Sequence, residues 1–491
     1  MKEKQTKSAV CGRSTVGHPK TAKRILALLL TCCMLVTTLC LPAFAVENSD
    51  PVADQTGEGV EAVADEGTDV IEIATADEFL AIDDNLEGNY KLTANIEFEE
   101  IVHLGSFKGT LDGDGHTLTI LGEYSAAKSY GMIFNALAGA TIKNIQIGTE
   151  EEPVRFAVGE LSKGTNIGLL GNNVSGGTVI SNVDVYIDAD LSGATKSTLN
   201  FGAFFPRSTA DTTTITNCTA NGKINVGTGG GTKNVAGFFG SYAATGIFEN
   251  CVSNIDFEGT AGTLRVAGIV GNVTGTVTVT NCVNTGTVQN EGTVNGIVYG
   301  SSGTLTAEGC VNLGTVNGES GLASAVTQTN EGAGVRIHNT ADESGLRFKF
   351  TMDEASLAAL ATLTTVYGAA NVQVGAVILP TELLRAEVAL TAENYANALT
   401  NAGSASEITD GYYHASLVKL YDTHYNIEYS CQSFWRFRTS ADGEWITVYA
   451  NNTKSRTVAG VAVEALADPN KPNYSQEQLN ILNAYANAQN G

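Results

Sequence analysis

The sequence predicts a mainly β protein in which a solenoid of stacked coils is followed by a smaller α+β module. The first observation is a near-repeat: residues 281–288 read NCVNTGTV, and residues 309–316, 28 positions later, read GCVNLGTV. The second is the alternation of β-branched residues between such landmarks, as in TVTVTNCV at 276–283, which is typical of strands bounded by Gly-rich turns. Units of about 30 residues that cannot bury their own apolar face must stack on one another.

Residues 1–45 have the organisation of a secretory signal peptide. Seven Lys or Arg residues and one Glu precede an apolar run at Ile25–Leu41, and Ala43-Phe44-Ala45 follows the run. This pattern predicts cleavage after Ala45 and export by the general secretory route. A transmembrane anchor is the alternative, which we favour less because the apolar run is short for a membrane span.

The rest of the chain is strongly acidic. Residues 46–70 contain eight acidic residues and no basic one, so we expect a disordered spacer there. From residue 46 onward the chain has 21 basic and 51 acidic residues. Such a surface repels nucleic acid and anionic lipid, so we expect no nucleic-acid partner and no membrane insertion after signal cleavage. No cofactor-binding motif is found, and we expect no cofactor.

The segment Ile71–Phe98 predicts a short helix and then a strand. Thr75 and Glu78 have the spacing of a capping box at the start of the helix. The apolar helix residues that we expect to turn inward are Phe79, Leu80 and Ile82.

About six repeat units follow, each with two landmarks. The first landmark is a Gly followed by mostly apolar residues: Gly131, Gly168, Gly202, Gly237, Gly268 and Gly296. The second landmark lies further along each unit: Asn144, Asn182, Asn217, Asn250, Asn281 and Gly309. Asn tolerates the left-handed backbone conformation better than other non-Gly residues, so we expect the second landmark to turn a corner of each coil. Gly309 suits the same turn even better.

Cysteines follow this corner in four units: Cys218, Cys251, Cys282 and Cys310. Stacked coils would place them in one internal column, spaced along a line at roughly 4.8 Å. Zinc needs ligands that converge on a point, and disulfides need side chains that approach one another, so neither fits the column well. We interpret these cysteines as small apolar residues that fill a slot, and we expect no metal site.

Beyond about residue 332 the pattern changes to an α+β module, 332–491. Two alternating strands are predicted within Gly334–Met352, a helix begins near residue 353, and Asn371–Pro380 predicts a buried strand. Phe434–Ala450 predicts a hairpin with Asp442-Gly443 in its turn. A closing helix is predicted from a Ser-x-x-Gln capping box at residues 475–478.

The run GSFKGTLDGDGHTLTILGEYSAAKSYGMIFNALAGATIKNIQIG at Gly105–Gly148, followed by the Gly-apolar units, resembles a family of secreted surface proteins of Firmicutes-type Gram-positive bacteria. Their short repeat is called the GLUG motif. The resemblance implies a right-handed parallel β-helix over residues 71–325 with an Asn ladder at one turn. The units at Gly202 and Gly296 depart from the motif because they lack its second Gly. The module resembles one appended to secreted proteins of gut-type Firmicutes.

Parallel β-helices often carry polysaccharide-degrading activity, so we looked for clustered carboxylates. The best match is LDGDGHTL, where Asp112, Asp114 and His116 lie on one face of an extended segment. The same letters also describe a simple Gly-rich turn, which we favour. The residues of this stretch are therefore weak catalytic candidates.

The hairpin of the module is the better candidate for binding. Alternation predicts Trp435 and Phe437 on the core face. The residues that remain as a platform for sugar rings are Trp445, Tyr449, Arg436 and Arg438. Aromatic faces can bury the apolar C–H surface of a sugar.

The sequence thus predicts an extracellular or cell-surface protein that is non-catalytic and adhesin-like. Its expected partner is an extracellular polysaccharide or a surface protein of a host or neighbouring cell. Two alternatives stay open: a polysaccharide lyase or glycosidase, and a structural spacer that presents the C-terminal module.

Overall fold

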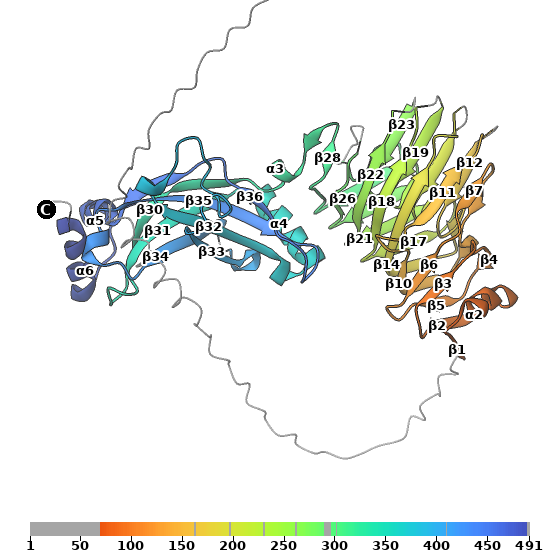
Figure 1. Cartoon of the computed structure of the whole chain (residues 1–491), viewed down its shortest axis with the longest axis horizontal. Helices are drawn as coiled ribbons and strands as arrows, with labels where there is room; N and C mark the ends of the chain where they lie inside the picture. The colour runs from red at the N-terminus through yellow and green to blue at the C-terminus, as the bar shows by residue number, and fades with distance from the viewer. Residues whose placement is uncertain are drawn as a thin grey trace, which may run out of the picture.

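A computed structural model describes residues 69–161, 164–195, 198–228, 231–260, 263–288, 296–300, 302–408 and 410–488. The predicted signal peptide and nearly all of the predicted spacer lie outside these residues. The chain folds as a parallel β-helix followed by a smaller α+β module, as predicted (Figure 1). The β-helix runs from red to green in the figure, and the module runs from green to blue.

Each complete coil of the β-helix contributes four strands. One such coil consists of β17 (Thr212–Thr216), β18 (Thr219–Asn225), β19 (Thr232–Ala236) and β20 (Phe239–Tyr242). The next coil begins with β21 (Thr245–Glu249), which pairs in parallel with β17 from Thr212↔Thr245 onward. Coils of 30–40 residues that pair in this way hydrogen-bond their backbones only to the coils above and below.

The strands form four columns along the stack. The first column contains β1 (Val70–Ile73), β2 (Asn89–Leu92), β5 (Thr110–Asp112), β10 (Thr141–Ile147), β14 (Val179–Asp190), β17, β21, β24 (Thr276–Thr280) and β26 (Thr304–Glu308). The second contains β3 (Ile96–Phe98), β6 (Thr117–Ile120), β10, β14, β18, β22 (Val252–Glu258), β25 (Val283–Asn284) and β27 (Val311–Asn312), with β7 (Tyr124–Ala126) and β11 (Val154–Val158) extending it. The third contains β8 (Tyr130–Gly131), β12 (Thr165–Gly168), β15 (Leu199–Gly202), β19 and β23 (Thr263–Ala267). The fourth contains β4 (Leu104–Phe107), β9 (Phe134–Ala138), β13 (Val174–Ser175), β16 (Phe205–Ser208) and β20.

The second landmark turns the corner between the first two columns. Its residues have a left-handed φ of 52–54°: Asn144, Asn182, Asn217, Asn250 and Asn281. Gly309 takes the equivalent position with a φ of 60°. The amide Nδ2 of Asn250 donates to Oδ1 of Asn217 at 3.1 Å, and that of Asn281 donates to Oδ1 of Asn250 at 3.3 Å. The side chains therefore form hydrogen bonds along the stack, in addition to fixing the turn.

The interior of the β-helix is apolar and partly aromatic. Cys218, Cys251 and Cys282 are fully buried, whereas Cys310 in the last coil is half-buried. Phe204 stacks on Phe238 with ring centroids 4.5 Å apart, because consecutive coils place equivalent residues directly above one another.

A short helix, α2 (Ala76–Leu80), lies at the first coil. The capping box between Thr75 and Glu78 is confirmed by both of its hydrogen bonds. Phe79 and Ile82 are buried as predicted, but Leu80 is 42% exposed, so that part of the prediction is wrong. Leu80 directly follows Phe79 and so lies about 100° around the helix from the buried face, whereas Ile82 belongs to the following 3-10 helix η1 (Ala81–Asp84).

The module is built on two antiparallel sheets. The three-stranded sheet contains β30 (Gln328–Arg336), β31 (Gly345–Met352) and β34 (Tyr412–Val418). The five-stranded sheet contains β33 (Leu399–Ser404), β32 (Val372–Pro380), β35 (Glu428–Phe437), β36 (Ile446–Tyr449) and β37 (Lys454–Thr457). The predicted hairpin is confirmed as β35 and β36. One face of each sheet contributes to a shared core, in which Phe348 and Phe350 join Ile378 and Cys431.

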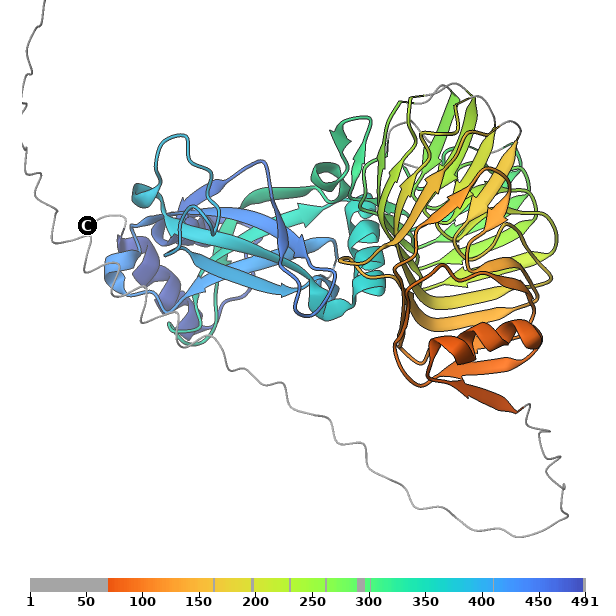
Figure 2. The same cartoon turned by 45° about the vertical axis from the view of Figure 1, so that its right-hand side comes forward.

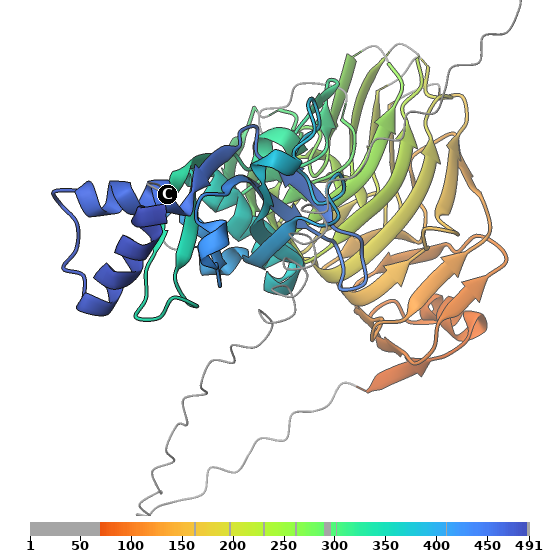
Figure 3. The same cartoon turned by 60° about the vertical axis from the view of Figure 1, so that its left-hand side comes forward.

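Three helices accompany the sheets: α4 (Glu354–Tyr367), α5 (Val458–Ala467) and α6 (Gln476–Asn487). The smaller connecting elements are β28 (Thr315–Val316), β29 (Glu319–Ser320) and α3 (Leu322–Ala325). The α5 and α6 helices, dark blue in Figure 3, lie at the end of the module away from the β-helix. The capping box of α6 is confirmed at Ser475 and Gln478.

The α4 helix packs against the last coils of the β-helix (Figure 2). Leu360 and Leu363 of α4 share a buried cluster with Val283 and Val311, which face outward from β25 and β27. The hydroxyl of Thr362 donates to the backbone carbonyl of Gly309 at 2.9 Å. The module is therefore in contact with the β-helix through an apolar interface.

Candidate functional site

The Asp112–His116 stretch forms a turn after β5. Asp114 has a left-handed φ of 49°, and its backbone N–H donates to Oδ1 of Asp112 at 3.0 Å. Asp112 also accepts from Nδ2 of Asn144 at 3.0 Å and forms an ion pair with Lys143 at 3.1 Å. It thereby begins a row of hydrogen-bonded side chains that continues through Asn144 to Asn182, whose Nδ2 donates to Oδ1 of Asn144 at 2.9 Å.

The other two candidates of this stretch also have partners. Asp114 forms an ion pair with Lys91 at 3.0 Å, and Nδ1 of His116 lies 3.2 Å from Oδ1 of Asn95. Burial acts to raise the pKa of Asp112, but the hydrogen bonds from Asp114, Asn144 and Lys143 hold it below its ordinary value. A general acid needs a raised pKa, so this carboxylate is not tuned for that role.

A hollow of about 400 Å³ lies beside this turn, between Asp114 and the corner residues Asn144 and Asn182. Asp184 also lines the hollow, and burial raises the pKa of its carboxyl group. Asp114, the other carboxylate that lines the hollow, is ion-paired with Lys91 and is therefore not a free partner for acid–base chemistry with Asp184.

The cysteines of the internal column are poor nucleophiles and poor ligands. Burial raises the pKa of Cys218 and Cys282 well above the ordinary value of a thiol. Within the described part of the chain, no cluster of three or more His, Cys, Asp or Glu side chains is arranged to hold a metal ion. The thiols therefore occupy the core as apolar groups.

The hairpin residues divide between the two faces of the five-stranded sheet. Trp435 and Phe437 are each 1% exposed, and their rings stack at 5.8 Å. Trp445 and Tyr449 are partly exposed and belong to the opposite, outer face, together with Arg436 and Arg438.

Two amide side chains hold the guanidinium groups on this outer face. Arg436 donates from Nε and Nη2 to Oε1 of Gln373 at 2.9 and 2.6 Å. Arg438 donates from Nε to Oδ1 of Asn371 at 2.8 Å. The guanidinium carbons lie 4.4 Å (Arg436) and 4.8 Å (Arg438) from the centre of the Trp445 ring. We call Trp445, Arg436, Arg438, Gln373 and Asn371 the hairpin cluster.

The hairpin cluster keeps an uncompensated positive charge. Among the described residues, no carboxylate lies within 4.0 Å of either guanidinium group. Burial and the nearby charge of Arg438 lower the pKa of Arg436. Arg is ionised at any physiological pH, so both charges persist and attract an oxygen-rich or anionic ligand.

Tyr449 lies at the edge of this cluster and is already engaged. Its hydroxyl accepts from the N–H of Ala392 at 3.0 Å and lies 3.0 Å from Oε2 of Glu393. Burial raises the pKa of Tyr449 to about 12. Its ring packs edge-on against Phe434 at 5.7 Å, so it supports the cluster more than it offers a free face.

Comparison with protein-family models, with curated protein sequences and with solved structures finds no match to this chain. In the part of the chain that the structure describes, no helix is both long and apolar enough to span a membrane.

Several polar ladders lie outside the predicted set. Nδ2 of Asn200 donates to Oδ1 of Asn166 at 2.8 Å, and Nδ2 of Asn234 donates to Oδ1 of Asn200 at 2.6 Å. A second series joins Nδ2 of Asn254 to Oδ1 of Asn221 at 2.8 Å. The first series could have been found from the sequence, because each Asn precedes a Gly landmark by two or three residues.

Proposed function

We propose that this protein is an exported, non-catalytic binding protein whose hairpin cluster binds a carbohydrate. Its sequence begins with the pattern of a secretory signal, and its repeats resemble those of bacterial surface proteins. The β-helix serves as a rigid scaffold for the module.

The observation that carries the proposal is the arrangement around Trp445. This indole is partly exposed and contacts Arg436 and Arg438, which have no carboxylate partner among the described residues. An indole packs well against the apolar face of a sugar ring. Guanidinium groups that are already oriented by Gln373 and Asn371 donate to sugar hydroxyl or carboxylate oxygens at little further cost in side-chain entropy.

Retention on insoluble glycans tests the proposal. The chain from residue 46 to 491 is incubated with plant, mucin and bacterial polysaccharides, and both the bound fraction and the released sugar ends are measured. We expect retention without release, and we expect Trp445→Ala to lower the affinity about tenfold or more, since a stacked aromatic contributes ~1–2 kcal/mol or more.

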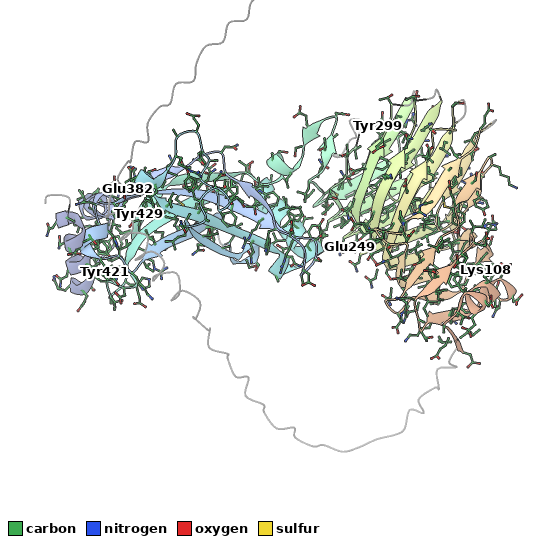
Figure 4. All side chains as sticks on the ribbon, in the orientation of Figure 1. Lys108, Glu249, Tyr299, Glu382, Tyr421 and Tyr429 are labelled. Carbon is green, nitrogen blue, oxygen red and sulfur yellow. The ribbon has the colours of Figure 1, made fainter. Side chains whose placement is uncertain are left out.

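Tyr421→Ala is the matched control. Tyr421 is also an exposed aromatic residue, at 57%, but it lies at the end of the module remote from the β-helix (Figure 4). Equal loss of retention in both variants would contradict a role for the hairpin cluster. No retention on any glycan would favour the spacer function.

The rival function, polysaccharide cleavage, is favoured by one observation: the hollow beside Asp114 also contains Asp184 with its raised pKa. Release of sugar ends that is abolished in Asp114→Ala or Asp184→Asn would replace our proposal with this one. Asp112→Ala is less informative, because Asp112 also holds Asn144 and Lys143.

A further inference from the structure

We infer that the outer face of the three-stranded sheet is a second binding site, which takes an oxyanion group such as a phosphate, sulfate or carboxylate. This face belongs to the opposite sheet of the module from the hairpin cluster, and the inference does not rest on the proposed function.

Three cationic side chains occupy this face. Arg347 and Lys349 are outward positions of β31, whose intervening residues Leu346, Phe348 and Phe350 are buried. Arg336 lies at the end of the neighbouring strand β30. Three positive charges thus lie on one sheet face of a chain whose formal net charge is −24.

The cations influence one another and a neighbouring histidine. Burial, followed by the charge of Arg336, lowers the pKa of Arg347. Burial, followed by the charges of Arg347 and Lys349, lowers the pKa of His414, which pairs with Lys349 across the sheet. In both cases a nearby positive charge adds to the effect of burial, as expected where cations lie close together on one face.

Protein groups leave part of this charge unsatisfied. Lys349 forms an ion pair with Glu331 at 3.4 Å, and its ammonium lies 4.8 Å from the centre of the Tyr412 ring. Arg336 donates from Nε to a neutral acceptor, the backbone carbonyl of Glu343, at 3.0 Å. The Nε of Arg347 is buried and has no hydrogen-bond partner among the described residues, although the side chain as a whole is partly exposed. No described acceptor fixes Arg347 through Nε, which leaves its partly exposed guanidinium group able to orient toward a bound oxyanion.

The backbone beside these cations leaves room for a ligand. Gly334 lies directly across from Arg347 on β30, and Gly332 lies directly across from Lys349. A methyl group added at either glycine would meet no atom within 4 Å. The backbone of β30 is therefore uncovered at these two positions, next to the guanidinium group of Arg347 and the ammonium group of Lys349. A planar guanidinium fork recognises oxyanions by paired hydrogen bonds.

Isothermal titration of the chain from residue 46 to 491 tests the site, with tripolyphosphate, a sulfated disaccharide and trigalacturonate as probes and maltotriose as the neutral control. We expect at least one oxyanion probe to bind and maltotriose not to compete with it. Arg347→Gln should lower the affinity about tenfold or more, since it removes a charge-assisted interaction. The ranking of the three probes identifies which oxyanion the site prefers.

A pair of substitutions at Gly334 separates binding from folding. Gly334→Ala fits the open space and keeps the charge, so binding should be retained. Gly334→Asp fits the same open space but places a carboxylate directly across from Arg347, so binding should be lost while Arg347 remains. Unchanged binding in Gly334→Asp or in Arg347→Gln, or no binding of any oxyanion probe, would overturn the inference. Trp445→Ala should leave the binding of tripolyphosphate, the probe without a sugar ring, unchanged, so failure of this site and failure of the hairpin cluster are distinguishable.

Discussion

The corner Asn residues make a quantitative prediction about the stability of the β-helix. Asn250 has a φ of 54°, donates to Asn217 and accepts from Asn281. Removal of these two partly exposed hydrogen bonds should cost ~0.5–1 kcal/mol each. An alanine at a left-handed position costs a further ~1 kcal/mol compared with glycine. We therefore expect Asn250→Ala to lower the free energy of unfolding by ~2–3 kcal/mol and Asn250→Gly by ~1–2 kcal/mol.

Equilibrium unfolding in urea, followed by far-UV circular dichroism, measures this difference. The control is Thr212→Ala, an exposed strand position in a neighbouring coil, which should change the free energy of unfolding by less than ~0.5 kcal/mol. The essential result is the order of stability: the protein with Asn250 should be the most stable, Asn250→Gly intermediate and Asn250→Ala the least stable. Glycine should be tolerated better than alanine because Gly309 already occupies the equivalent corner of the last coil with a φ of 60°. Equal destabilisation by Ala and Gly would show that backbone conformation is not what selects Asn at this corner.

Three further predictions concern the interface and the interior. Val283→Asp should destabilise the contact with α4 by ~3 kcal/mol or more by burying a carboxylate, and limited proteolysis between the β-helix and the module should become faster. Lys233 is fully buried, and burial lowers its pKa from the ordinary value of 10.5. At pH values just below 10.5 the unfolded state therefore binds more protons than the folded state, so the free energy of unfolding should rise with pH there. Lys233→Met should remove this slope in urea titrations at several alkaline pH values. Because burial raises the thiol pKa, Cys282 should react with a disulfide reagent only after unfolding and Cys310, which is half-buried, should react first.

The stack of parallel coils could be predicted from the sequence because each coil repeats the same landmarks. Two landmarks per unit fix the register of consecutive coils, and the Asn281 and Gly309 corners follow from the backbone preferences of those residues. In the module, by contrast, strand pairing joins segments such as β31 and β34 that are about 60 residues apart and carry no repeat. The hairpin cluster could be nominated because Arg436, Trp445 and Arg438 are close in sequence. On the cationic face of β31, Arg336 and Arg347 lie on neighbouring strands of the predicted segment Gly334–Met352, but His414 joins them only through the β31–β34 pairing, which carries no sequence signal.

The interface between the β-helix and the module has a sequence signature that alternation alone does not explain. The outward position after the Cys slot is polar in the earlier coils, with Thr117, Gln146, Asp184 and Thr219 in register. In the last three coils the same position is occupied by Val252, Val283 and Val311. These valines are at most 6% exposed, because the module covers them.

The near-repeat CVN therefore has two causes: an inward cysteine that fills the core, and an outward valine that docks the module. An apolar column that faces outward only where a second domain covers it favours a fixed contact over a flexible tether. The two proposed binding faces of the module would then be held at a set orientation to the β-helix. In that arrangement the spacer function and the binding function are compatible, because the β-helix determines the direction in which the binding faces point.

Val283→Asp separates the two roles. It should leave the affinity for glycans and oxyanions unchanged while it frees the orientation of the module. Small-angle X-ray scattering would detect that freedom as an increased radius of gyration. A lost affinity with an unchanged radius would refute this separation.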